Sequence, residues 1–347
     1  MANGGIIGPV NTIQACSQAE VITKVTSSTP SAVTTQPLTT TINYVIAAGG
    51  GGGGSTGGGS GGGGGAGGLR SGSGISVCGA TALGAVVIGA GGSALADGGN
   101  SSLVIGCTTY TSQGGGKGAK SFSGFADAGT GGSGGGGQGY TAPQSSAAGA
   151  AGNTPPTSPS QGNPGGDGAE APSPTHSGAN AQAAGGGGGA GAAGVDACQP
   201  SPTLSNGGAG GAGLDLSPLV GTTAGVCGVF SGGGGGGKRM SPGTAGAGGS
   251  GGGGQGAQGP NTRSAGAGIV NTGGGGGGGG EGPSSGTGGA GGAGVVVIKE
   301  PEIVASASGV WSMQTVYDQR LNNNWVTTPS FIAATGGTET TVGDYKI

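Results

Sequence analysis

Three short runs of β-branched and apolar residues frame the chain. Two lie near its start, at Glu20–Thr26 (EVITKVT) and Thr39–Ala47 (TTTINYVIA), and one lies much later, at Val295–Lys299 (VVVIK). β-branched side chains favour strands, and Pro30 and Pro37 mark the connection between the first two runs. Strands are therefore predicted at all three places. Since the second and third enter and leave the middle of the chain, they are expected to pair.

A helical pattern occurs close to the end of the chain. Within 309–325 (GVWSMQTVYDQRLNNNW), Met313, Val316, Tyr317 and Leu321 fall on one face of a helix. The final stretch, 331–347, looks like the start of a further β module and offers an open strand edge.

A single short helix cannot bury its large rings against itself. Attachment or oligomer contacts are therefore predicted at Trp311, Tyr317 and Trp325. Removal of residues 309–347 is expected to leave a soluble glycine body that no longer assembles.

The middle of the chain is dominated by glycine: 101 of 347 residues are glycine and 18 are proline. These levels exceed those of ordinary globular chains, and the strict G-X-Y repeat of collagen is missing. Composition divides the chain into an N-terminal β segment at 1–48, a glycine-rich body at 49–294 and a C-terminal segment at 295–347. A disordered linker is the simplest alternative for such tracts. The glycine runs, however, alternate with segments that carry apolar side chains. The longest runs are 49–54, 61–65, 185–189, 232–237 and 273–280.

Unbroken glycine permits one compact solution. Polyglycine II helices have three residues per turn and a rise of about 3.1 Å, with backbone groups that point outward to neighbouring helices. A β-carbon inside such a bundle would hold the helices apart. The predicted fold is mostly β and irregular, with a packed polyglycine II helix body flanked by short β-strands and one short C-terminal helix. Little α-helix is expected between 49 and 294, and Gly276→Val should disrupt folding more than a change at a loop residue such as Ser158.

Charge and cysteine content argue against several functional classes of protein. The 10 Lys and Arg residues oppose 13 Asp and Glu, which gives a net charge of −3 and argues against nucleic-acid binding. No stretch is long and apolar enough for a membrane span, and no secretory signal is visible, so synthesis in a cytoplasm is expected.

The odd number of cysteines favours free thiols, with a single Cys78–Cys107 disulfide as the alternative. The five cysteines are Cys16, Cys78, Cys107, Cys198 and Cys227.

Candidate catalytic features do not combine into a site. Residues 232–238 match a phosphate loop, but Arg239 follows where Mg²⁺ binding needs Ser or Thr. His176, the single histidine, lies in a Pro- and Ser-rich segment. Glu300 and Glu302 flank Pro301 and are interpreted as a solvated turn. We therefore expect no enzyme activity, no catalytic or metal-binding residues and no cofactor.

Aromatic residues between the glycine runs are the better candidates for function, because aromatic anchors are typical of recognition surfaces. The predicted receptor-binding residues are Tyr110, Phe122, Phe125 and Tyr140. The alternative is that these rings plug the ends of the glycine body.

Four segments carry a family resemblance: 42–54 (INYVIAAGGGGGG), 84–92 (GAVVIGAGG), 288–301 (GGAGGAGVVVIKEP) and 309–325. They resemble glycine-rich modules of phage and marine-virus virion proteins, and the pattern is similar to polyglycine II tail-fibre adhesins. The resemblance implies a virion structural protein, as a tail fibre, adhesin or capsid-surface fibre for host attachment.

The implied partners are other virion proteins and a host surface receptor or glycan, with a homo-oligomer or a cap on a trimeric fibre as the assembly. The alternative function is a secreted cell-surface, matrix or ice-binding glycine-rich protein. Ice binding would require regularly spaced Thr or small residues on a flat face, and no such spacing is recognised here.

Overall fold

The computed structural model falls into two units, Cys16–Val304 and the combined terminal segments Met1–Ala15 and Ala305–Ile347. In the terminal unit the described part is a pair of antiparallel strands, β14 (Thr341–Val342) and β15 (Tyr345–Lys346). The predicted helix at 309–325 lies outside the described residues, and the three-segment division by composition stays a prediction. The structure describes these two strands and residues 17–303, apart from 31–32, 58, 122–126, 142–147, 172–181, 202–203, 240–241, 260–263 and 283–284.

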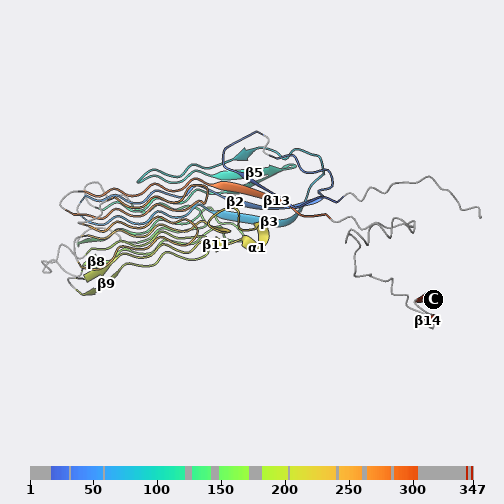
Figure 1. Ribbon diagram of the computed structural model, residues 1–347. Helices are drawn as coiled ribbons and strands as arrows, with labels where there is room; N and C mark the ends of the chain where they lie inside the picture. The colour runs from blue at the N-terminus through green and yellow to red at the C-terminus, as the bar shows by residue number, and fades with distance from the viewer. Residues whose placement is uncertain are drawn as a thin grey trace, which may run out of the picture. The chain divides into compact units, whose positions relative to one another are not determined.

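An antiparallel sheet of four strands opens and closes the glycine-rich unit (Figure 1). Its order is β1 (Val21–Val25), β13 (Val295–Glu300), β2 (Thr41–Ala47) and β3 (Leu69–Ser76). The predicted pairing is confirmed, because β2 and β13 are joined in register from Ala47↔Val295 to Asn43↔Lys299.

The two central strands, β2 and β13, are largely buried on both faces, whereas β1 and β3 at the edges are partly exposed. On one face, Val296 and Ile298 pack with Leu103 from a second sheet, which has the order β4 (Val86–Val87), β5 (Ser101–Ile105) and β6 (Thr108–Ser112). On the other face, Val295 and Val297 pack against Phe230. Burial on both faces explains why β13 is an unbroken apolar run rather than an alternating one.

The second face is covered by a small subdomain. It contains α1 (Ser217–Val220) and the antiparallel strands β11 (Leu214–Asp215) and β12 (Val229–Phe230). α1 is the one α-helix among the described residues of the body, so the expectation of little α-helix between 49 and 294 is confirmed there.

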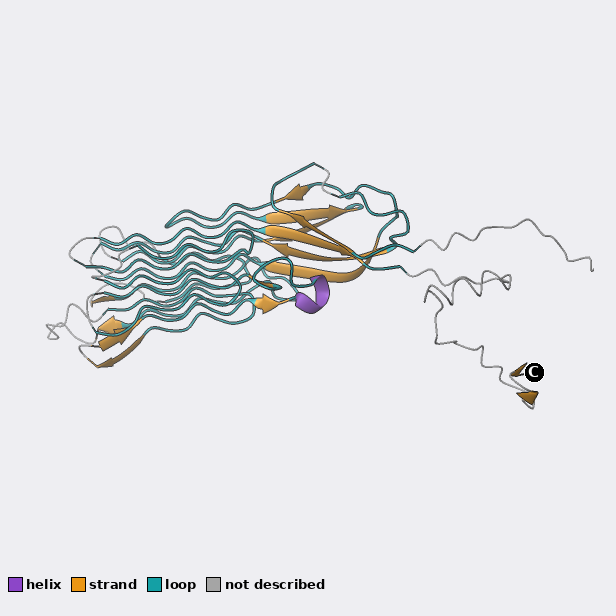
Figure 2. Ribbon diagram, in the orientation of Figure 1, coloured by secondary structure: helices purple, strands orange, loops and turns teal. Residues whose placement is uncertain are grey.

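The glycine segments run side by side from the sheet to the opposite end of the unit (Figure 2). At that far end, β7 (Tyr140–Thr141) pairs in parallel with β8 (Glu170–Ala171), and β9 (Cys198–Ser201) pairs with β10 (Leu204–Asn206). We call this end the loop end and the other the sheet end. The runs are buried and packed against one another, as expected, and are not solvent-exposed tails.

Backbone hydrogen bonds in the body repeat every three residues. Along 61–67, the N–H groups of Gly61, Gly64 and Gly67 all donate to one neighbouring segment, and the two residues between them donate to two others. The carbonyl groups follow the same rule toward three further neighbours. Six segments therefore surround 61–67: 116–119, 185–188 and 273–279 accept from it, and 51–54, 133–136 and 234–237 donate to it.

Glycine is required at these positions because the adjacent segments approach the backbone very closely. A Cβ atom on Gly62, Gly63 or Gly64 would lie 1.9, 2.1 or 2.2 Å from a carbonyl oxygen of an adjacent segment. Those separations are far below any tolerable contact. Within the five longest runs, Gly273 alone has a positive φ, +73°, so close approach, and not unusual backbone conformation, explains the choice of glycine at the other positions.

Outer segments show the same period in their side chains. Along 286–293, Gly286, Gly289 and Gly292 are buried, while Thr287 and Ala290 are exposed. The spacing is visible in the sequence as GGAGGAG at 207–213 and 288–294. It distinguishes peripheral from central segments.

Candidate functional site

Polar side chains replace glycine where the segments reach the loop end. Ser60, Ser121, Gln138, Gln182 and Lys238 are all buried there. Several lie directly beside the connections between segments. This polar layer forms the base of the loop end, and it is the candidate functional site of the described residues.

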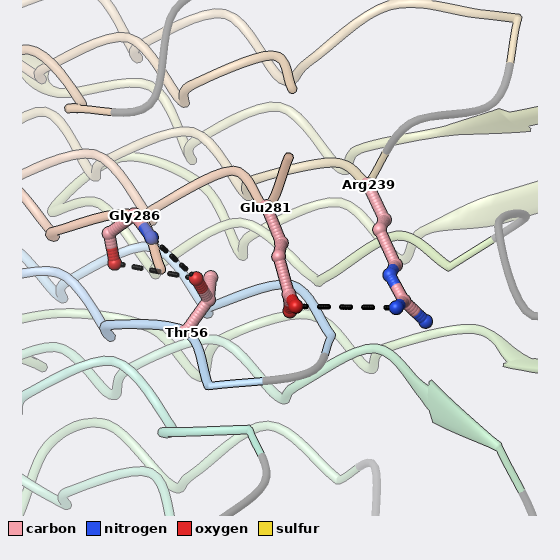
Figure 3. A network of polar contacts seen from close by, with 4 residues as sticks. All are labelled: Thr56, Arg239, Glu281 and Gly286. Atoms are coloured by element: carbon pink, nitrogen blue, oxygen red, sulfur yellow. Dashed lines mark hydrogen bonds and ion pairs between the residues drawn. The ribbon is translucent and has the colours of Figure 1, made fainter. Parts of the chain in front are cut away.

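One part of the layer ties two distant segments together (Figure 3). Thr56 N donates to the carbonyl oxygen of Gly286 at 2.9 Å, and Gly286 N donates to Thr56 Oγ1 at 2.7 Å. The two residues are 230 positions apart. A buried side-chain oxygen thus continues the backbone pattern at the point where the glycine run ends.

An ion pair closes the neighbouring corner. Arg239 Nη2 lies 3.9 Å from Glu281 Oε1, with side chains 20% and 12% exposed (Figure 3). Arg239 N also donates to the carbonyl oxygen of Gln182 at 2.9 Å. A pair of this length at partial exposure stabilises weakly.

Lys238 is the most deeply placed cation of the layer, with 1% of its surface exposed. Its backbone bridges Ala183 on one side and Gln258 on the other. Burial lowers the pKa of the Lys238 ammonium, because desolvation disfavours the charged form.

The phosphate-loop pattern at 232–238 is not a phosphate cradle. The N–H groups of Gly233, Gly234 and Gly235 donate to carbonyl oxygens of three other segments at 2.9 Å. A phosphate loop needs such N–H groups free for its ligand. The interpretation of this match as a consequence of glycine content is thereby supported.

Ser60, Ser121 and Gln182 also contribute side-chain oxygens that are buried and have no hydrogen-bond partner in the described part of the chain. Gly59 lies between two of them, since a Cβ there would be 2.9 Å from Gln182 Oε1 and 3.0 Å from Ser121 Cβ. The layer is therefore polar and tightly packed. Its geometry suits a rigid base that supports loops.

The predicted receptor-binding aromatics do not gather in one place. Tyr110 lies in β6 at the sheet end, where its ring centroid is 5.0 Å from that of Tyr44. Tyr140 begins β7 at the loop end. Phe122 and Phe125 lie outside the described residues, so the role of the four in binding stays a prediction. The predicted attachment residues Trp311, Tyr317 and Trp325 also lie outside the described residues.

Burial changes the pKa of Tyr44, whose ring contacts Tyr110. The pKa of Tyr44 is raised above its ordinary value, first by desolvation and then by the neighbouring Tyr110. This position fits the alternative in which aromatic rings pack at an end of the glycine body.

The interpretation of Glu300 as part of a solvated turn is wrong. Glu300 is 2% exposed, and its Oε2 accepts from Thr39 Oγ1 at 2.5 Å and from Gln36 N at 2.7 Å. Gln18 Nε2 donates to the same threonine oxygen at 2.7 Å. These partners belong to the N-terminal part of the chain, so the local sequence around Pro301 gave no sign of them. Glu302 is exposed, as expected.

Four cysteines are described, and all are free and exposed. The expectation of free thiols is confirmed for Cys78, Cys107, Cys198 and Cys227, and the alternative Cys78–Cys107 disulfide is not formed. Within the described ranges, no three His, Cys, Asp or Glu residues come together as metal ligands. His176 lies outside these ranges. None of the helices in the described part of the chain has the length and apolar character needed to cross a bilayer.

Strands that open and close a body of hydrogen-bonded glycine segments define a glycine-rich structural module. The model of the glycine-rich domain family matches residues 26–300, and the chain belongs to this family. The match begins one residue after β1 and stops at the last residue of β13. No curated protein matches the chain significantly.

Proposed function

We propose that the chain is a bacteriophage virion structural protein that displays binding loops on a glycine scaffold, as a tail fibre, adhesin or capsid-surface fibre for host attachment. One observation carries the proposal. Gln18 and Ile303 exchange both backbone hydrogen bonds at 2.8 Å, so the glycine-rich unit begins and ends at the sheet end. The loop end is at the opposite side of this unit, which suits attachment at one end and recognition at the other.

The scaffold itself is proposed to be a bundle of polyglycine II helices. The three-residue repeat of hydrogen bonds and the six neighbours of 61–67 support this assignment. A crystal structure tests it directly: φ near about −75° and ψ near about +145° are expected along 61–65. Strand values, near about −140° and +135°, would contradict it.

A rigid base favours recognition by the loops it carries. Loops held by the Thr56–Gly286 and Arg239–Glu281 contacts lose less conformational freedom on binding than loops on a flexible support. The proposed partners are other virion proteins at the sheet end and a host receptor or glycan at the loop end. The virion is the proposed location, and catalysis is not part of the proposed role.

Two experiments separate the parts of this proposal. Immunogold labelling of purified phage particles that encode the chain is expected to show gold at a fixed place on the particle. Fluorescently labelled protein is expected to bind host cells and to reduce phage adsorption in competition. Absence of label from particles would refute the virion role, whereas labelled particles without cell binding would refute the adhesin role alone.

A second candidate function is ice binding by a secreted protein of the same fold. Its support is the three-residue spacing of exposed small residues along 286–293, which was not recognised in the sequence. A thermal-hysteresis assay at millimolar protein decides the matter. Hysteresis that is lost in Ala290→Leu would favour this candidate, and no hysteresis would exclude it.

A further inference from the structure

The sides of a hydrogen-bonded glycine bundle present the same hazard of unwanted pairing as the edge of a β-sheet. An outer segment directs some N–H and C=O groups away from the body, and another glycine-rich segment could pair with them. The hazard is acute here, because the chain itself supplies many such segments. Two independent observations describe how the sides of this body are built.

The first observation concerns the outward positions of the outer segments. Thr287, Ala290 and Ala293 follow one another at the three-residue repeat, and so do Ser264, Ala267 and Val270. All carry a Cβ atom. Inside the bundle, a Cβ on Gly276 would lie 2.1 Å from a neighbouring carbonyl oxygen. A Cβ at an outward position would take up part of the space that an incoming segment needs.

The second observation concerns N–H groups at the sides. Asp97 Oδ1 accepts from Lys117 N, Asp167 Oδ1 accepts from Gly149 N, and Asp196 Oδ1 accepts from Asp167 N, each at 2.8 Å. Pro164, three residues before Asp167, has no N–H to offer. In each of the three Asp contacts, a short side chain from the adjacent segment accepts from the N–H group that an added segment would need.

We propose that these carboxylate caps and the Cβ-bearing outward positions seal the sides of the glycine body, so that a second copy of this chain cannot add edgewise. Partners then reach the body through its two ends. The proposal depends on the hydrogen-bond geometry and not on the virion role, so either can fail without the other.

The caps can be removed without touching the bundle interior. The variant Asp97→Ala/Asp167→Ala/Asp196→Ala exposes three N–H groups, whereas Asp97→Asn/Asp167→Asn/Asp196→Asn keeps an acceptor oxygen and removes the same three charges. Size-exclusion chromatography with light scattering of the full chain, over a range of concentrations, compares both with the unmodified protein. The alanine variant is expected to self-associate at a concentration about tenfold lower or less, and the asparagine variant is expected to match the unmodified protein.

Two results would overturn the proposal. Unchanged association of the alanine variant would show that the caps do not limit addition. Equal association of both variants would show that charge repulsion, and not capping, keeps copies apart. If the triple variant fails to fold, amide hydrogen exchange of Lys117 in Asp97→Ala gives the answer: faster exchange at this amide supports capping, and unchanged exchange contradicts it.

Discussion

Substitution of one central glycine tests the packing of the whole body. Gly276 N donates to the carbonyl oxygen of Gly51 at 2.9 Å, and its own carbonyl accepts from Gly64 N at 2.8 Å. A Cβ on Gly276 would lie 2.1 Å from the carbonyl oxygen of Gly289. Alanine at this position must therefore push the 286–293 segment away by about 1 Å, because such carbon–oxygen contacts are repulsive below about 3 Å.

The expected loss of stability follows from that displacement. Overpacking of a tight interior costs about 1–3 kcal/mol, and a buried hydrogen bond that is broken on one side costs about 1–3 kcal/mol more. Gly276→Ala is thus expected to lower the free energy of unfolding by about 2–6 kcal/mol. The valine variant should lose more, since its side chain is larger.

Gly266→Ala is the matched control. Gly266 lies in an outer segment, is exposed, and a Cβ there would be 3.0 Å from its nearest neighbour, Gln255 N. Its change in stability is expected to stay within about 1 kcal/mol, because alanine also reduces the entropy of the unfolded chain.

Guanidinium denaturation followed by far-UV circular dichroism measures both variants. A folded Gly276→Ala protein with the same midpoint as Gly266→Ala would refute the close-packing argument.

The remaining predictions address the sheet end, the thiols and assembly. Glu300→Ala is expected to lower the unfolding free energy by about 1–3 kcal/mol, because alanine removes the acceptor oxygen to which Thr39 Oγ1 and Gln36 N donate; Glu302→Ala is the exposed control, and equal midpoints would contradict the buried role. Since the pKa of Tyr44 is raised, its contribution to stability is present below the ordinary value of 10.0 and is lost as pH rises through the folded pKa; denaturation between pH 9 and 12 should show a steeper decline for the unmodified protein than for Tyr44→Phe. Titration with a thiol reagent under native conditions is expected to detect at least the four exposed cysteines, and fewer would indicate a disulfide. A chain lacking residues 309–347 is expected to stay soluble but to be absent from particles, as immunoblotting of purified virions would report; normal incorporation would place the anchor in the N-terminal strands.

The strands were predictable because their information is local. β-branched residues at Thr41–Ala47 and Val295–Glu300 favour strands wherever they occur, and their positions at the entry and exit of the body indicated the pairing. The neighbours of each glycine segment were not predictable. One glycine run is chemically identical to another, so no side chain records that 61–67 lies between 51–54 and 273–279.

The polar features were hidden for a related reason. Glu300 is buried by partners 261 and 264 positions away, and nothing beside Pro301 indicates that contact. At the loop end, the polar residues next to the runs were present in the sequence, but their burial depends on which segments meet there. The three-residue spacing of Ala and Thr was the one local signal that would have separated outer from central segments.

The Gln18–Ile303 bridge also determines how the unit would respond to a mechanical load. Both ends of the unit meet there, and the pair Val21↔Glu300 follows at the same end of β1 and β13. Tension applied through residues 17 and 303 therefore peels β1 from β13 one hydrogen-bonded pair at a time, which is the weak direction of an antiparallel pair. The glycine bundle lies outside this line of force. β1 is therefore expected to separate from β13 at low force, while the interior of the body stays intact.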